Sequence, residues 1–509
     1  MLVIGLDGAS PDLLNLFMNQ GKLPFFKKMT ERSAYGPLET SIPPVTPPAW
    51  ASITTGMNPG KTGVFDALKI DYNYNPVFMT SSQKKAQELW DYLDYSIIVN
   101  LPCSYPPRPI KGVMVSGMYT PTLSSEFTYP ASIKDEIVLR FPNYRIELDW
   151  ERYKYNKERF TELLYSTLKE SYQLLNYFYN NPNWELCFFV DVSIDRICHL
   201  DWDLDAVCSV YQKVEENIKP FVEDAWRRGL YVFVVSDHGF ELKHKQFNIN
   251  TFLKKQGYLT TNTDDVVRGD SNLDWLFRIV PYHKVSALVE KSGLKKLLTT
   301  FTRIVDSPLD KIDWSNTTAF SLSTQQIYVN SKERFIKGKL DKGCQNSLID
   351  ELRNKLLLLK DPDTDLPIVD TVYSNEELYW GRHSSEGPDL VVVPQPDYYI
   401  SQSFKPEIVT MEERAYHSKD GIIFMSGPRI KHKHELSDPN VVDVAPTILH
   451  VLGREVPGQM DGVVLVNAFI EGSSFEKWNR GQSVRIEDTK SIVDSRITNI
   501  RRKLLHNVT

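Results

Sequence analysis

The chain has 509 residues, which is long enough for more than one domain, and its 41% hydrophobic and 24% charged residues are ordinary for a soluble globular protein. The formal net charge of −6 gives no reason to expect nucleic acid or a membrane surface as a partner. No stretch approaches the ~18 uninterrupted apolar residues of a transmembrane helix, so none is expected.

The cysteines and the N-terminus indicate the compartment. The five cysteines form no Cys-x-x-Cys pair, and their odd number argues against a closed disulfide framework. The first residues lack a basic region, and their apolar run stops at Asp7, too soon for a signal peptide. We therefore expect a reducing, cytoplasmic location.

The N-terminal segment predicts the fold class. The short apolar run from Leu2 to Leu6 is typical of a fully buried parallel strand, and Ser10 then begins a helix that ends at Gly21. This order predicts an α/β fold, doubly wound, with a mostly parallel central sheet and helices on both faces. Ligands of such sheets bind beyond the carboxyl ends of the strands, where Asp7 lies. A lone carboxylate there would by default cap the turn.

Two proline pairs surround Thr46 in the segment from Ser41 to Gly56. Pro47 suits the first helical position, so the pattern predicts Thr46 as the N-cap of a helix that runs towards Gly56. A hydroxyl at this place lies where backbone N–H groups and the helix dipole favour an anion, which suits a nucleophile that attacks a negatively charged group. Considered alone, an ordinary threonine cap explains the pattern better.

Further buried strands are predicted at Ser96–Asn100, Trp184–Val190 and Tyr231–Val235, with helices over residues 157–179 and 205–228. Asp195 and His199 follow the second of these strands with the spacing of one helical face. Such a pair is by itself a weak metal signal, because a surface hydrogen bond explains it equally well.

Asp237 and His238 stand side by side at the end of the next strand. A buried sheet edge would not hold a carboxylate and an imidazole together without partners, so metal ligation is the favoured interpretation. His417 also precedes an apolar run, but a lone histidine there is usually structural.

The change in composition after the fourth strand indicates the domain organisation. Residues 1–245 and 385–470 are predicted as the catalytic core, which includes a buried strand at Asp389–Val393. Residues 246–384 are predicted as an inserted cap or smaller subdomain that covers the site. Residues 471–509 are predicted as a charged tail with a docked helix, because apolar residues there form one stripe.

Together the candidate site residues suit one kind of chemistry. Three carboxylates, three imidazoles and one hydroxyl suit two divalent metal ions with mixed nitrogen and oxygen ligands, zinc being expected and manganese the alternative. Two metals about 3.5–4 Å apart can bind both the attacking and the leaving oxygen of an in-line displacement at phosphorus. The seven residues are Asp7, Thr46, Asp195, His199, Asp237, His238 and His417.

The order of these motifs resembles the alkaline phosphatase superfamily, specifically its type I phosphodiesterase/nucleotide pyrophosphatase branch. Within it, the chain is similar to an archaeal and bacterial group of predicted phosphohydrolases or phosphomutases. The matches span residues 2 to about 462, and six in the right order are specific together. They are Gly5-Leu6-Asp7-Gly8, Thr46-Pro47-Pro48-Ala49-Trp50 with Thr55-Gly56, Asp195-Arg196-Ile197-Cys198-His199, Ser236-Asp237-His238-Gly239-Phe240, His417 with Asp420-Gly421, and Asp443-Val444-Ala445-Pro446-Thr447.

The resemblance implies roles for these residues. Asp195, His199 and His417 would hold one metal. Asp7, Asp237 and His238 would hold the other, and Thr46 would bridge towards it as the nucleophile. A phosphoryl or phosphodiester group would pass to Thr46 and then to water, so the implied substrate is a small phosphoester or a nucleotide-like molecule.

The chain also departs from the family pattern. It has Thr62-Gly63 where the family often has histidine before the glycine, and no residue matches the arginine that grips phosphate in the alkaline phosphatases. These departures favour a diesterase over a phosphomonoesterase. Thr46-Pro-Pro-Ala-Trp also differs from the sulfatase motif, which argues against sulfate esters.

Alternatives remain at this stage. A phosphomutase would use the same metals and nucleophile but return the phosphoryl group to a sugar or glycerate, and it would need a closing cap. A non-catalytic binding protein is disfavoured, because a retired site has little physical reason to keep buried charges together. Trp50, one turn beyond Thr46, is a candidate stacking surface for substrate, and plain core is at least as good an explanation. The oligomeric state is not indicated.

Overall fold

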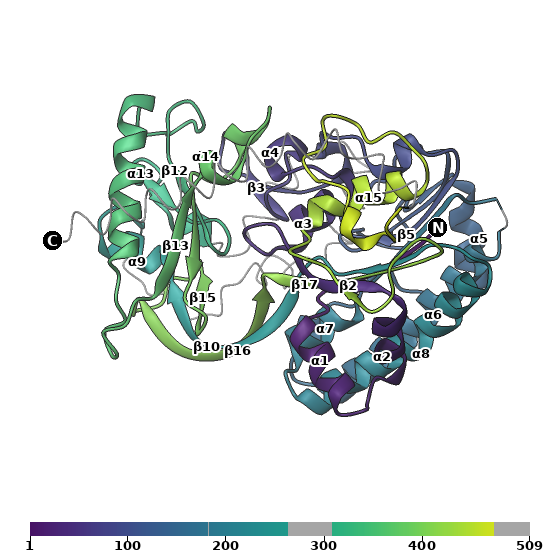
Figure 1. Cartoon of the computed structure of the whole chain (residues 1–509). Coiled ribbons are helices and arrows are strands. Elements are labelled where there is room, and N and C mark those ends of the chain that lie inside the picture. Colours follow the sequence, from purple (N-terminus) through teal and green to yellow (C-terminus); the bar gives the residue numbers. More distant parts are fainter. Residues whose placement is uncertain (182, 263–307, 473–509) are drawn as a thin grey trace.

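The computed structural model describes residues 1–181, 183–262 and 308–472. Figure 1 shows a larger body built on a central sheet and a smaller body joined to it by two long curved strands. The predicted tail, residues 471–509, lies outside the described residues except for residues 471 and 472, and its predicted helix lies wholly outside them.

The larger body contains a nine-stranded sheet of order β18-β2-β17-β9-β1-β8-β5-β6-β7. Its middle is parallel, because β1 pairs in parallel with β8 and β9, and β5 pairs in parallel with β8 and β6. The predicted mostly parallel α/β sheet is confirmed. The strands are β1 (Leu2–Leu6), β2 (Ala34–Glu39), β5 (Ser96–Leu101), β6 (Gly112–Ser116), β7 (Thr128–Tyr129), β8 (Leu186–Asp191), β9 (Val232–Val235), β17 (Asp420–Ser426) and β18 (His434–Glu435).

Helices cover both faces of this sheet (Figure 1). One face packs on α1 (Pro11–Asn19), α2 (Pro24–Arg32), α6 (Lys157–Tyr179), α7 (Ser193–Leu200) and α8 (Leu204–Arg227). The other face packs on α3 (Thr46–Thr55) and α15 (Val444–Val451), with α4 (Pro59–Thr62) following α3. A further helix, α5 (Ser132–Arg140), lies next to β7.

The side chains of β1 explain why this strand is apolar throughout. Leu2, Ile4 and Leu6 pack in the core beneath one layer of helices. Met1 and Val3 point the other way, into the core beneath α3 and α15. Because successive side chains of a strand alternate between faces, a strand covered on both sides must be apolar at every position.

The smaller body has its own core and two small sheets. A three-stranded sheet has the order β15-β10-β16, and a four-stranded sheet has the order β11-β12-β14-β13. Its elements are β10 (Gly239–Asn248), α9 (Ile249–Lys255), β11 (Ala319–Phe320), β12 (Gln326–Val329), α13 (Lys342–Leu357), β13 (Val369–Ser374), α14 (Asn375–Leu378), β14 (Leu390–Pro394), β15 (Tyr398–Ser401) and β16 (Val409–Ser418). A hairpin of β3 (Leu68–Ile70) and β4 (Pro76–Phe78) packs against this core.

The position of β14 differs from the sequence expectation. The apolar run at Asp389–Val393 forms a strand, but that strand pairs with β12 and β13 of the smaller body. The chain returns to the central sheet only at β17. A short buried strand has the same apolar composition in either sheet. Composition therefore could not show where the chain returns to the catalytic core, which was predicted at residue 385.

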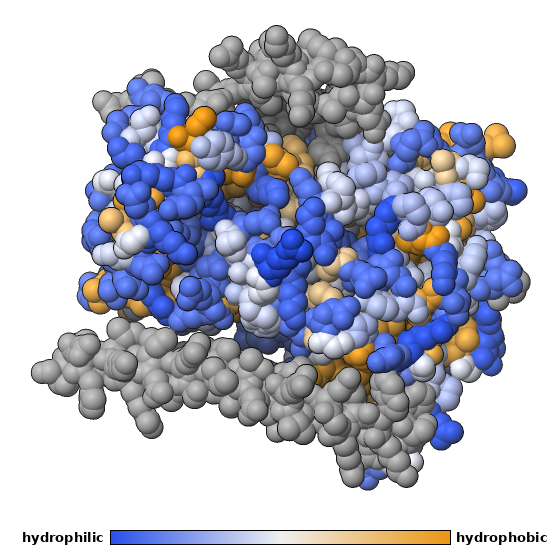
Figure 2. Space-filling model, turned by 90° about the horizontal axis from the view of Figure 1, so that it is seen from above, coloured by the Kyte–Doolittle hydropathy of each residue, from blue (hydrophilic) through white to orange (hydrophobic). Residues whose placement is uncertain are grey.

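The surface seen from above is mostly hydrophilic where the structure describes it, with scattered hydrophobic side chains (Figure 2). Within residues 1–181, 183–262 and 308–472, no helix is both long and apolar enough to cross a membrane.

Gly5 in β1 gives a prediction about how closely the sheet and α3 pack. A Cβ at this position would overlap the ring of Trp50 and touch the Val190 side chain. Overpacking a dense core costs about 1–3 kcal/mol, so Gly5→Ala should lower the free energy of unfolding by that amount. Urea denaturation measures the change.

Gly458→Ala is the matched control, because nothing lies within 4 Å of a Cβ built there. It should leave the free energy of unfolding unchanged or raise it by up to about 1 kcal/mol. Equal stability of the two variants would contradict the packing that the structure shows around Gly5.

Candidate metal centre

The site forms where the adjacent parallel strands β9, β1 and β8 end. Asp7 follows β1, and Asp237 and His238 follow β9. Asp195 and His199 lie in α7, which begins two residues after β8. Thr46 begins α3, and His417 comes from β16. The structure therefore brings all seven predicted residues to one end of the sheet, as the crossover rule for α/β folds leads one to expect.

The candidate metal-ligating atoms form two groups, Asp195 with His199 and His417, and Asp7 with Asp237 and His238. Within each group the candidate ligand atoms lie within 4.8 Å of one another. In the first group, Asp195 Oδ1 is 3.2 Å from His199 Nε2 and 3.6 Å from His417 Nε2. In the second, His238 Nε2 is 3.2 Å from Asp237 Oδ2 and 3.8 Å from Asp7 Oδ1.

Each of the three aspartates has one oxygen held by a donor and one that faces the site. Trp50 Nε1 donates to Asp7 Oδ2 at 2.8 Å, Gly8 N donates to Asp237 Oδ1 at 3.2 Å, and Arg196 Nη1 donates to Asp195 Oδ2 at 3.0 Å. The opposite oxygens, Asp7 Oδ1, Asp237 Oδ2 and Asp195 Oδ1, are buried without a hydrogen-bond partner among the described residues. Buried carboxylate oxygens need partners, and divalent cations fit these positions.

Two of the imidazoles are oriented by backbone carbonyls. His417 Nδ1 donates to the Pro44 carbonyl at 2.9 Å, and His238 Nδ1 lies 3.2 Å from the Gly239 carbonyl. A proton on Nδ1 leaves the lone pair on Nε2, the arrangement found in metal-ligating histidines. The Nε2 atoms of His417 and His199 lie 3.1 Å apart. The two nitrogens therefore converge on one point, as ligands of a shared cation do.

The electrostatics of the site agree with cation binding. Burial, and then the charge of Asp195, raises the pKa of Asp7 well above its usual range, and burial with Asp7 does the same for Asp237. Burial alone would also raise the pKa of Asp195, but His199 and Arg196 hold it well below its usual range. Burial lowers the pKa of His199 and of His238, which favours the neutral form that binds metal.

Thr46 lies at the second group. Its side chain is 4% exposed, and its Oγ1 is 3.1 Å from His238 Nε2. The predicted helix is confirmed, but Val45 is its N-cap and Thr46 is its first residue. The hydroxyl thus makes no cap hydrogen bond and faces the site instead.

The start of α3 also offers fewer free donors than the sequence interpretation assumed. Pro47 and Pro48 have no backbone N–H, and Ala49 N already donates to the Val45 carbonyl at 3.2 Å. Stabilisation of an anion at this helix start must therefore come mainly from cations and only weakly from backbone N–H groups.

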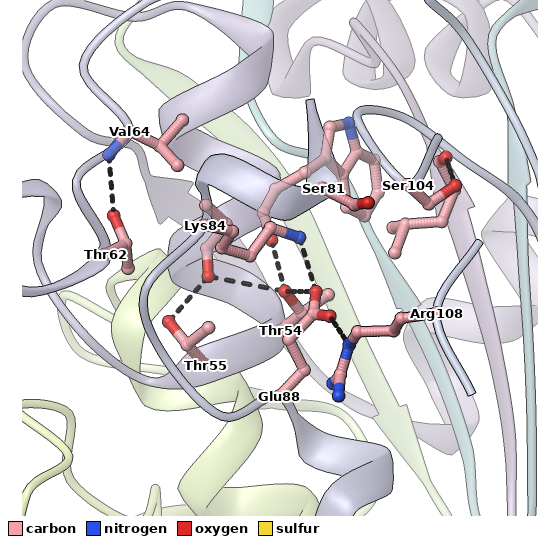
Figure 3. Close-up of polar contacts among 12 residues, drawn as sticks. Thr54, Thr55, Thr62, Val64, Ser81, Lys84, Glu88, Ser104 and Arg108 are labelled. Atoms are coloured by element: carbon pink, nitrogen blue, oxygen red, sulfur yellow. Dashed lines mark hydrogen bonds and ion pairs between the residues drawn. The ribbon is translucent and has the colours of Figure 1, made fainter. Parts of the chain in front are cut away.

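A buried network behind α3 holds the helix in place (Figure 3). Thr54, near the end of α3, donates to Glu88 Oε1 at 3.3 Å, and Lys84 pairs with the same oxygen. Arg108 Nε donates to Glu88 Oε2 at 3.0 Å and its guanidinium also pairs with Asp91. This network fixes the far end of the helix that carries Thr46.

The backbone turn at Gly8 lets the two groups of candidate metal ligands lie close together. Its φ of +75° lies in the left-handed region, and a Cβ there would be 2.8 Å from Phe240 and 3.0 Å from the Asp195 Cα. Only glycine fits this turn without strain.

Trp50 is not a substrate-stacking surface. Its side chain is 1% exposed, its ring packs edge-on against Phe188, and its N–H holds the Asp7 carboxylate. The core interpretation was therefore correct, with an added role as a donor to a metal-ligating residue that spacing alone could not reveal.

A cleft of about 540 Å³ opens beside the first group, between the larger body and the smaller one. The Trp150 ring stacks on His199, with centroids 5.4 Å apart and an interplanar angle of 7°. Sequence reasoning missed this lining, because it comes from segments that are far apart in the sequence, among them the irregular segment after β7. The lining includes Tyr119, Trp150, Tyr153, Tyr416, Arg145, Arg152, Arg196 and Arg414 beside His199 and His417.

Substitution of Trp50 tests the hydrogen bond to Asp7. Trp50→Phe keeps an aromatic ring but leaves Asp7 Oδ2 without its donor. Loss of such a partner of a metal ligand typically costs about 10- to 100-fold in metal affinity. We expect a loss of this size, measured by zinc titration against a competing chelator.

Trp90→Phe is the control, because the Trp90 indole N–H is buried without a hydrogen-bond partner among the described residues. It should leave zinc affinity unchanged. Equal affinities for the two variants would show that the Trp50 hydrogen bond does not support the site.

Solved structures with the same fold cover nearly the whole chain. Murine ectonucleotide pyrophosphatase/phosphodiesterase 5 is 14% identical over 90% of this chain and 96% of its own, with a TM-score of 0.52. Phosphonoacetate hydrolase from Sinorhizobium meliloti is 13% identical over 87% and 93%, with a TM-score of 0.53. Alkaline phosphatase PafA is 15% identical over 92% and 99%, with a TM-score of 0.55.

An inactive threonine-to-alanine variant of the murine protein, with the same coverage and identity, is in complex with AMP. A search of curated proteins finds no significant match. The model of one family matches residues 1–422, more than four fifths of the sequence. The chain belongs to the type I phosphodiesterase/nucleotide pyrophosphatase family.

Proposed function

We propose that this chain is a two-metal phosphodiesterase or nucleotide pyrophosphatase in which Thr46 is the nucleophile. The observation that carries the proposal is the Thr46 hydroxyl, buried and 3.1 Å from a nitrogen of the candidate ligand His238. A threonine in the core would not need three carboxylates and three imidazoles around it.

The proposed metal ligands divide as the two groups do. Asp195, His199 and His417 would hold one ion, and Asp7, Asp237 and His238 the other, with Thr46 next to the second. Zinc is the expected metal and manganese the alternative, because the donors are nitrogen and carboxylate oxygen without sulfur. Bound divalent ions would supply Lewis-acid stabilisation of the charge that develops on the attacking and leaving oxygens.

The residues of the chain then carry out a double displacement. The Thr46 hydroxyl loses its proton and its Oγ1 forms a bond to phosphorus, while the bond from phosphorus to the departing alcohol or phosphate breaks. Water next attacks phosphorus from the side that the departing group left, the bond from phosphorus to Thr46 Oγ1 breaks, and Oγ1 takes up a proton released by that water. Helix α3 and the network at Glu88 keep Oγ1 in one position through both steps.

A diester is the favoured substrate, because the buried guanidinium of Arg196 is already paired with carboxylates. Arg196 is 7% exposed and pairs with both Asp195 and Glu147, so it brings no unpaired positive charge to the substrate. A phosphodiester carries one negative charge and a monoester two, so an arginine that is already paired beside the candidate metal ligands suits the diester better than the monoester. The AMP complex of the murine protein supports a nucleotide-like substrate.

Thr46→Ala tests the nucleophile. We expect hydrolysis of bis(p-nitrophenyl) phosphate by zinc-loaded protein to fall at least about 1,000-fold, as when other covalent nucleophiles are removed. Thr46→Ser retains the hydroxyl and should retain measurable turnover. Full activity of Thr46→Ala would contradict the proposed mechanism.

Removal and restoration of metal tests whether the reaction depends on bound divalent ions. Dialysis against a chelator should abolish turnover of the same diester, and added Zn²⁺ or Mn²⁺ should restore it. The protein should bind two equivalents of metal by elemental analysis. Activity indifferent to both treatments would exclude a two-metal reaction.

A further inference from the structure

Asp66 is a carboxylate in an unexpected place. It lines the cleft together with Pro44, Val45 and His417, and it is only 5% exposed. No ion pair to it is found within the described ranges, 1–181, 183–262 and 308–472. Buried acidic side chains are normally paired with a cation, so a lone one at an anion-binding cleft calls for a functional reason.

The segment that carries Asp66 is fixed from both sides. The neighbouring Phe65 carbonyl accepts a hydrogen bond from Gln326 Nε2 at 3.0 Å. The Phe65 ring packs edge-on against Tyr379, whose hydroxyl donates to the Ile42 carbonyl at 2.7 Å. Asp66 Oδ1 itself accepts from Ala67 N at 2.6 Å. The carboxylate therefore cannot simply swing out to solvent when a substrate binds.

The Asp66 side chain lines the same cleft as the proposed metal ligands His199 and His417. Burial raises the pKa of Asp66 to about 6, against the opposing effect of hydrogen bonds and of His417, so the group is ionised at pH 8. Pro44 and Val45 immediately precede the proposed nucleophile, and His417 donates to the Pro44 carbonyl. The cleft beside the proposed nucleophile thus contains a buried carboxylate as well as arginine side chains, which are Arg145, Arg152, Arg196 and Arg414.

The number of charges on the substrate decides how strongly the Asp66 carboxylate opposes its binding. A phosphodiester has one ionised oxygen at pH 8, whereas a monoester and inorganic phosphate carry close to two charges. The repulsion from a fixed carboxylate grows with the charge on the ligand, and it is weakly screened in a partly buried cleft. Discrimination by an unfavourable contact is a common device of specific sites.

We propose that Asp66 is a specificity-determining residue that disfavours doubly charged phosphate groups relative to phosphodiesters at this site. The inference rests on the proposed function at Thr46 and adds a residue that the metal-ligand pattern does not include. Asp66 belongs to neither group of candidate metal ligands.

Asp66→Asn tests the charge alone, because the amide oxygen can still accept from Ala67 N. The measurement is kcat/KM at pH 8 for p-nitrophenyl phosphate and for bis(p-nitrophenyl) phosphate, in zinc-loaded protein. We expect the ratio of monoester to diester activity to rise at least 10-fold in the variant. An unchanged ratio would overturn the inference, including the case in which both activities fall equally because the loop has moved.

Inhibition by inorganic phosphate gives a second readout on the same variant. The inhibition constant measured against the diester should fall at least 10-fold in Asp66→Asn, and an unchanged constant would count against the inference. Glu333→Gln removes the same charge from an exposed position and should change neither quantity. A shift in Glu333→Gln as large as that in Asp66→Asn would assign the effect to net charge and overturn the inference.

The two proposals fail in different ways. If Thr46→Ala hydrolyses the diester as fast as the unaltered protein, the proposed function fails, whatever the Asp66 ratio. If diester hydrolysis depends on Thr46 but the ratio and the phosphate inhibition do not respond to Asp66→Asn, only the inference about specificity fails.

Discussion

Three buried carboxylates within a few ångströms of one another are the constraint on which this site depends. Asp7, Asp195 and Asp237 repel one another in a space from which water is largely excluded. The chain supplies each with one donor, from an indole, a guanidinium and a backbone amide, and leaves the other oxygen facing the site. Bound cations would satisfy these oxygens, so the proposed metal binding would also stabilise the local fold.

Most of the fold and several of the proposed site residues could be predicted from the sequence for one physical reason. A parallel strand covered by helices must be apolar throughout, and its carboxyl end is where polar side chains reappear. Asp7 and the pair Asp237 and His238 stand at such ends, and α6 coincides with its apolar periodicity. His417 was different, because only a tertiary contact brings β16 to this edge, and the family resemblance supplied what the pattern did not.

Other features could not be predicted, because they depend on neighbours distant in sequence. An apolar strand such as β14 looks the same whichever sheet it joins. Trp50 could equally have been exposed or buried, and its bond to Asp7 spans 43 residues. Arg196 and Asp66 are single charged residues whose burial, and hence whose meaning, appears only in the folded molecule. Capping patterns also could not determine the exact first residue of α3.

The two-stranded ribbon of β10 and β16 has a consequence for the whole molecule. Phe240 pairs with His417 at one end of the ribbon, and β10 pairs with β15 of the smaller body at the other. The candidate metal ligand His417 therefore lies on the same ribbon that joins the smaller body to the larger one (Figure 1). By thermodynamic linkage, any ligand that shifted the smaller body would change the affinity of the proposed site for metal, and metal binding would in turn bias the position of the smaller body by the same free energy.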